Sequence, residues 1–82
     1  MAHTAELRAQ VRSGRDFGRA IGNARRRRGE TQADFGARLG ITRSRLAQIE
    51  SGLTSPLIEH ELRALRALGA TVTITWAEDE DR

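Results

Sequence analysis

Hydrophobic residues recur at helical spacing over four successive stretches of the chain. The first stretch opens with Ser13 and Asp16, the pattern of a capping box, and the second repeats that pattern with Thr31 and Asp34. The fourth opens with Ser55-Pro56, and proline favours the first helical position. The pattern therefore predicts four helices: from Ser13 to a stop at Gly29, from Thr31 to Gly40, from Thr42 to Glu50, and from Ser55 to Gly69.

The period changes after Gly69. Residues 71–76 alternate strictly between threonine and larger apolar side chains, which predicts a half-buried strand. We find no second strand in the chain to pair with it, so we expect it to pair with another molecule or to fray. Residues 1–12 carry too few apolar side chains to dock firmly, and we expect a mobile segment with at most a turn or two of helix from Thr4.

The second and third predicted helices meet the physical demands of a helix-turn-helix arrangement. Gly36 provides a small side chain where two steeply crossing helices touch, and Gly40 tolerates the positive φ of a sharp turn. Ile41, Leu46 and Ile49 would anchor the third helix from behind. Its polar face, opposite those residues, is then free to contact a ligand.

The segment 31–52, which begins with "TQ" and closes with "IESG", closely resembles the XRE/Cro-C1 family of helix-turn-helix DNA-binding proteins. The resemblance extends from about Phe17 to Gly69. Phe35 and Gly36 stand where the family usually has leucine and alanine, and they keep the same roles. The resemblance implies a mainly α fold, a lambda-repressor-like bundle of four to five short helices, with one C-terminal β-strand that pairs across a homodimer.

The resemblance also implies a role for each polar residue of the motif. Arg43, Ser44 and Gln48 take the base-reading positions, where arginine suits guanine and glutamine suits adenine. Thr42 would cap the third helix and touch phosphate, and Arg45 would grip phosphate or read a base.

Three further residues take positioning roles in the family. Gln32 takes the phosphate-contact position at the start of the second helix. Arg25 and Glu50 correspond to an ion pair that ties the first helix to the end of the third. For the other arginines of the run at 25–28, a solvated helix face is the simplest interpretation, and the alternative is that some of them add phosphate contacts near DNA.

The ending "LGATVTITW" resembles HipB-like antitoxins, in which such a strand pairs with its copy across a two-fold axis. Val72, Ile74 and Trp76 would then form the dimer contact, packed on helices of both subunits. The alternatives are a strand folded back on its own domain, a disordered segment, or a Trp76 that anchors a partner protein. The implied protein is a homodimeric repressor on a roughly palindromic operator in double-stranded DNA, and the antitoxin of a HipA-like toxin kinase. A phage-type or restriction-controller regulator without a toxin, an antitoxin that acts mainly by binding protein, and an architectural DNA binder remain alternatives.

Charge agrees with a polyanionic partner. The chain has 82 residues and a net charge of +3, but four of its eleven acidic residues lie together at 78–81, which leaves 13 arginines against 7 acidic residues over 1–77. From the predicted elements and this acidic run, we divide the chain into an N-terminal segment (1–12), a DNA-binding domain (13–69), a dimerisation strand (70–77) and an acidic tail (78–82).

Several classes of protein are disfavoured. The chain has no cysteine, and His3 and His60 lie in no metal-binding spacing and beside no nucleophile, so we expect neither an enzyme nor a cofactor or metal site. No apolar run approaches the length of a membrane span and no signal peptide is evident, so we expect a soluble, cytoplasmic protein without a membrane partner.

Overall fold

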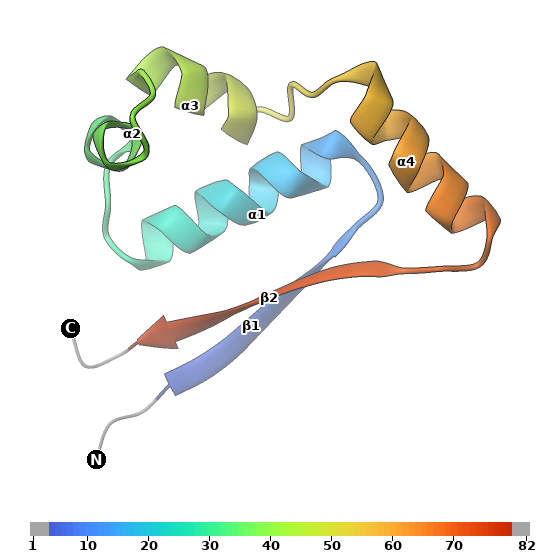
Figure 1. Ribbon diagram of the computed structural model, residues 1–82. Coiled ribbons are helices and arrows are strands. Elements are labelled where there is room, and N and C mark those ends of the chain that lie inside the picture. The colour runs from blue at the N-terminus through green and yellow to red at the C-terminus, as the bar shows by residue number, and fades with distance from the viewer. Residues whose placement is uncertain (1–3, 80–82) are drawn as a thin grey trace.

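The computed structural model describes residues 4–79, and the side chains of 7–77. Within this part of the chain a strand precedes four helices and a second strand follows them (Figure 1). All four predicted helices form. The elements are β1 (Thr4–Val11), α1 (Gly14–Arg27), α2 (Gln32–Leu39), α3 (Arg43–Glu50), α4 (Pro56–Ala67) and β2 (Val72–Asp79).

Side-chain caps fix the starts of three helices as the sequence predicts. Thr31 Oγ1 accepts a hydrogen bond from the Asp34 N–H at 3.1 Å, and Thr42 Oγ1 accepts one from the Arg45 N–H at 3.0 Å. Ser55 caps α4 in the same way. Gly40 closes α2 with a φ of 76°, in the left-handed region that favours glycine.

The start of α1 is capped differently from the prediction. Ser13 lies at the N-cap, but its side chain makes no capping hydrogen bond. The Gly14 N–H donates instead to the carboxylate of Glu59 in α4, with distances of 3.1 and 3.2 Å. Asp16 accepts from the Arg12 N–H at 2.8 Å. A charged group 45 residues away thus replaces the local capping box, and it ties α4 to the first turn of α1.

The prediction that the C-terminal strand has no mate within the chain was wrong. β1 pairs with β2 in an antiparallel ribbon, and residues 4–11 of the segment that we expected to be mobile or helical form that strand. Leu7, Ala9 and Val11 alternate with polar residues, so the segment has one apolar face, which the short alanine side chain makes hard to recognise. The apolar residues pair across the ribbon as Leu7 with Trp76, Ala9 with Ile74, and Val11 with Val72.

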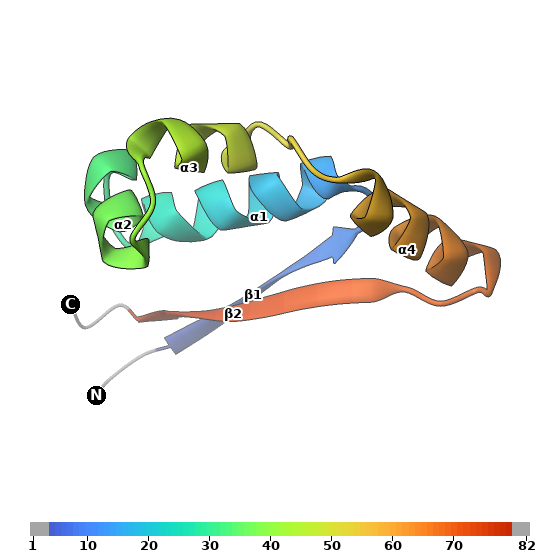
Figure 2. The same ribbon diagram turned by 45° about the horizontal axis from the view of Figure 1, so that its top comes forward.

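This pairing removes the reason for assigning Val72, Ile74 and Trp76 to a dimer contact. The ribbon crosses beneath α1, as the two views show (Figures 1 and 2). These three side chains are half-buried, whereas their neighbours Thr73 and Thr75 are exposed. The backbone of β2 therefore pairs with β1 of its own chain. The apolar residues of β2 lie opposite those of β1, on the same face of the ribbon.

A close approach between backbones positions α3 on α1. Gly18 is buried, and a Cβ atom at this position would lie 2.2 Å from the carbonyl oxygen of Ile49. The end of α3 therefore lies directly against the backbone of α1. Gly36 plays the predicted role at the α2–α3 crossing, where a Cβ would lie 3.1 Å from the Ile41 carbonyl oxygen.

Candidate nucleic-acid interface

The helix α3 has an anchored face and an exposed face. Leu46 is completely buried, at 0% exposure, and Ile41 and Ile49 on either side of it are half-buried. These residues anchor α3 as the sequence predicts. Five of the six side chains predicted to contact DNA are exposed on α3 and its cap: Thr42, Arg43, Ser44, Arg45 and Gln48.

The guanidinium groups of Arg43 and Arg45 make no hydrogen bond or ion pair with the part of the chain that the structure describes. A cation on a fixed helix without an internal partner retains all its donors for a ligand. The face can therefore offer two guanidinium forks, one amide and two hydroxyl groups, which are the groups that bind base edges and phosphates. These residues are exposed on one short helix and its cap, while their contacts with DNA stay predictions.

Behind this face, Arg25 and Glu50 form the predicted ion pair. Arg25 Nε donates to Glu50 Oε2 at 2.6 Å, and Arg25 Nη2 donates to Glu50 Oε1 at 3.1 Å. The third guanidinium nitrogen, Nη1, donates to the backbone carbonyl oxygen of Glu30 at 2.6 Å. The two side chains are only 9% and 8% exposed. One guanidinium group thus joins the last turns of α1 and α3 and the loop before α2.

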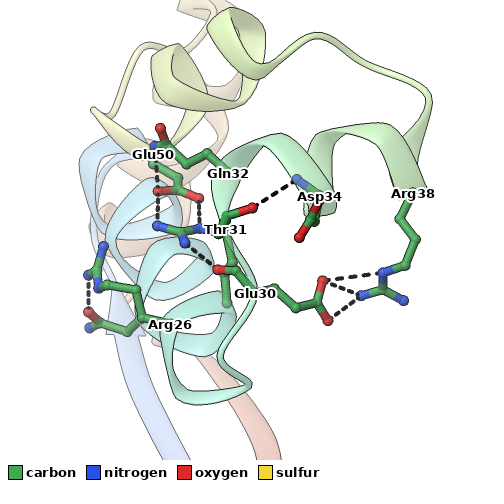
Figure 3. A network of polar contacts seen from close by, with 9 residues as sticks. Arg26, Glu30, Thr31, Gln32, Asp34, Arg38 and Glu50 are labelled. Carbon is green, nitrogen blue, oxygen red and sulfur yellow. Dashed lines mark hydrogen bonds and ion pairs between the residues drawn. The ribbon is translucent and has the colours of Figure 1, made fainter.

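Gln32 belongs to the same network, which Figure 3 shows from close by. Its amide Nε2 donates to Glu50 Oε1 at 3.0 Å, so the side chain is held by Glu50 within the protein. It is half-buried at the first residue of α2, where the backbone N–H groups of a helix have no intrahelical acceptor. The phosphate contact predicted for Gln32 remains a prediction, and its starting geometry is now defined.

The network changes the ionisation of both partners. Hydrogen bonds from Arg25 lower the pKa of the Glu50 carboxyl, and the amide of Gln32 acts in the same direction, while burial opposes them. The same hydrogen bond to Glu50 raises the pKa of Arg25. Both groups are therefore charged at neutral pH, and the pair is an electrostatic brace between helices.

Three arginines lie beside this network, of which Arg26 belongs to the run considered above and the other two were not predicted to contact DNA. Arg15, Arg19 and Arg26 line a hollow of about 300 Å³ on the exposed side of α1, with Glu50 and Ser51 at its edge. We call Arg15, Arg19 and Arg26 the α1 arginine row. The backbone of Gly18 and Gly22 also lines the hollow.

The spacing of these residues was the available signal. Arg15 and Arg19 are four residues apart and Arg26 is seven further on, so all three lie on one side of a helix. Arg26 donates to the Asn23 side chain at 2.7 Å, and neither Arg15 nor Arg19 makes a side-chain hydrogen bond with the described residues. The row therefore adds positive charge close to the end of α3.

Other features of the described residues bear on the classes considered above. His60 is exposed on α4. No group of three or more potential metal-ligating side chains occurs within the part of the chain that was searched. In the same residues, none of the helices combines the length and apolar character required to cross a bilayer.

Comparison with known proteins gives one match. A family model described as a helix-turn-helix domain matches residues 16–74, well over half of the chain, from the first turn of α1 into β2. No curated protein and no solved structure matches the chain significantly. The matched range includes α2, the turn at Gly40 and α3.

Proposed function

The chain belongs to the helix-turn-helix family of DNA-binding regulators, and we propose that it represses transcription by binding a specific sequence in duplex DNA with α3 in the major groove. The observation that carries this proposal is the exposed face of α3. Its arginines have no partner among the described residues, and the helix behind them is fixed by the fully buried Leu46.

Base recognition falls to three residues on this face. Arg43, in the first turn of α3, would bind guanine O6 and N7 with two guanidinium N–H groups, and Gln48, one turn further, would bind adenine through its amide. Ser44 accepts or donates and so tolerates several bases. Thr42 and Arg45 would bind phosphates. Arg45 could alternatively read a base.

The orientation on DNA would be set by phosphate contacts at the start of α2. Gln32 keeps one amide N–H and its carbonyl oxygen outside the bond to Glu50, and the first N–H groups of α2 point from the same helix end. The α1 arginine row would bind further phosphates. Such contacts carry no sequence information but increase the affinity and its dependence on salt.

Two copies would act together on the DNA. One α3 helix contacts only a few base pairs, and a two-fold symmetric pair reads two half-sites about one helical turn, roughly 34 Å, apart. A homodimer on a roughly palindromic operator follows. Repression then results because the bound protein covers promoter DNA.

A narrower proposal is that the protein is the antitoxin of a HipBA-like operon. Its support is the resemblance of residues 68–76 to the ending of HipB-like antitoxins. The partner would be a HipA-like toxin kinase. Tagged protein purified from its native host should then retain such a kinase through a wash at moderate salt. If the regulator purifies without a kinase and still binds its operator, the antitoxin proposal is wrong and the protein is a repressor without a toxin partner.

The DNA-binding proposal is tested with labelled duplexes. Fluorescence anisotropy would compare DNA from upstream of the protein's own gene with a scrambled duplex of the same length and salt. Arg43→Ala should reduce binding free energy by about 1–3 kcal/mol and relax preference at one base position, whereas Gln32→Ala should weaken binding to every sequence alike.

Arg63→Ala is the matched control, because Arg63 is exposed on α4 and its guanidinium group makes no hydrogen bond or ion pair with the described residues. It should change affinity little. Equal affinity for operator and scrambled DNA, or an Arg43→Ala variant that binds like the control, would refute recognition by α3.

A further inference from the structure

The described chain has the shape of a plate rather than a sphere. Its principal extents are 42 × 33 × 15 Å, and its radius of gyration is 14.4 Å. A compact domain of this length has a radius of gyration of about 12 Å. Figures 1 and 2 show the cause, since α4 extends away from α2 and α3 instead of closing over them.

One side of α4 is attached to the rest of the chain. Leu62 is buried at 4% exposure, and it lies on the same side as Glu59, which caps α1. Arg66 Nη1 donates to the backbone carbonyl oxygen of Arg12. These three residues follow at helical spacing, so they fix α4 by a single stripe.

Another side of α4 carries exposed apolar residues. Five of the six large hydrophobic side chains that the structure leaves exposed come from the segment 53–68, and we call these five the α4 apolar face. Leu57 is 66% exposed and Leu68 is 82% exposed. Scattered exposed leucines are ordinary, but a contiguous group marks an interaction site. The face consists of Leu53, Leu57, Ile58, Leu65 and Leu68.

A groove continues this face toward the helix-turn-helix core. Its volume is about 330 Å³, and its apolar lining includes Phe17 and Ile21 of α1 and Ile49 of α3, together with Leu53 and Ile58 of the α4 apolar face. Because α4 does not cover them, Phe17, Ile21 and Ile49 are only half-buried. The core of the domain is thus open on the side where the apolar face lies.

We propose that a second copy of this chain covers the α4 apolar face and the adjoining groove, with the same surfaces meeting across a two-fold axis. The proposal deepens the two-copy part of the proposed function, since it places the dimer contact on α4 rather than on Val72, Ile74 and Trp76.

The surface area supports this occupant. The chain exposes 5979 Å², whereas a folded monomer of its mass, 9.1 kDa, exposes about 4,900 Å². The excess is on the order of 1,100 Å² per copy. Two copies that hide this excess bury roughly 2,200 Å², the size of a stable dimer interface. β1 and β2 pair with each other within the chain, so β2 has a mate without a second copy, and apolar surface on α4 remains to be buried.

The test is sedimentation equilibrium of the full chain without DNA, over concentrations from about 1 to 100 µM. The wild type should be a dimer, with a melting temperature that rises with concentration. The double variant Leu57→Ser, Leu68→Ser should dissociate roughly a hundredfold more readily, because four exposed leucines per dimer are lost. Both leucines are exposed, so circular dichroism should show the wild-type helix content.

Leu39→Ser is the matched control. Leu39 is 53% exposed at the end of α2, outside the α4 apolar face, and its substitution should leave the dimer intact. A wild type that is monomeric at 100 µM, or a double variant that dimerises like the control, would overturn the proposal. Because no DNA is present, either result leaves recognition by α3 to be judged separately, and a failure to bind operator leaves the dimer result standing.

Discussion

Replacement of Glu50 by glutamine provides the sharpest test of how the scaffold holds the DNA-binding face. Glu50 accepts three hydrogen bonds, two from Arg25 and one from Gln32, at distances of 2.6 to 3.1 Å. A glutamine of the same shape has one carbonyl oxygen in place of two carboxylate oxygens. At least one bond is lost, and the guanidinium group, whose side chain is 9% exposed, loses its counter-charge.

The expected cost is about 3 kcal/mol of unfolding free energy. Removal of one partner from a buried ion pair costs roughly 3–5 kcal/mol, and the lower end applies here because the molecule is thin and solvent lies near the pair. For a domain of this size the melting temperature should fall by roughly 12–24 °C. Thermal and urea unfolding followed by circular dichroism would measure both quantities.

Glu30→Gln is the control. Glu30 pairs with Arg28 and Arg38 at 3.5 and 3.0 Å, but the side chains of those arginines are 51% and 61% exposed. Exposed pairs of this kind contribute less than about 1 kcal/mol. If Glu50→Gln destabilises the protein no more than Glu30→Gln, the brace is not what holds α1, α2 and α3 together.

Three further predictions follow from the same structure. The pKa of Glu50 is lowered in the folded state. The stability that its charge contributes is therefore fully present above the ordinary carboxyl pKa range and is lost as pH falls through the pKa of the folded state. The difference in unfolding free energy between wild type and Glu50→Gln should shrink below about pH 5. Gly18→Ala should cost about 2 kcal/mol or more, measured by urea unfolding, since its Cβ would lie 2.2 Å from the Ile49 carbonyl oxygen. Replacement of both Arg15 and Arg19 by glutamine should lower the slope of log affinity against log salt by about 2 without altering base preference, whereas Arg63→Gln should leave the slope unchanged.

Local signals explain which parts of the fold the sequence predicts. The caps at Thr31, Thr42 and Ser55 act within three residues of themselves, and their helices begin where expected. The cap of α1 could not be predicted, since it comes from Glu59, 45 residues along the chain. The spacing of Ser13 and Asp16 is compatible with a capping box, but the Ser13 side chain makes no capping bond and the Asp16 carboxylate accepts from the Arg12 N–H instead.

The strand β1 could not be predicted either, because it also depends on a distant part of the chain. Leu7, Ala9 and Val11 form a weak alternating pattern that becomes a strand only beside β2, whose residues lie more than 60 positions away. Strand formation depends on that non-local partner more than on propensity. The Arg25–Glu50 pair joins residues 25 positions apart and therefore leaves no local sequence pattern. Family resemblance, rather than spacing, led to its prediction.

The network divides the residues proposed to contact DNA into one that is held by hydrogen bonds within the protein and others that are not. Gln32 is ordered before any DNA arrives, because Glu50 holds one of its amide N–H groups, and Glu50 is itself held by Arg25. The entropy lost in fixing that side chain is therefore spent during folding and does not weaken binding. Arg43 and Arg45 have no such restraint within the described chain and must be ordered by DNA itself. On the proposed function, phosphate contacts at α2 would set the register first, and the unrestrained arginines on α3 would then select among sequences. Loss of the Glu50 carboxylate should therefore weaken binding to operator and scrambled DNA alike.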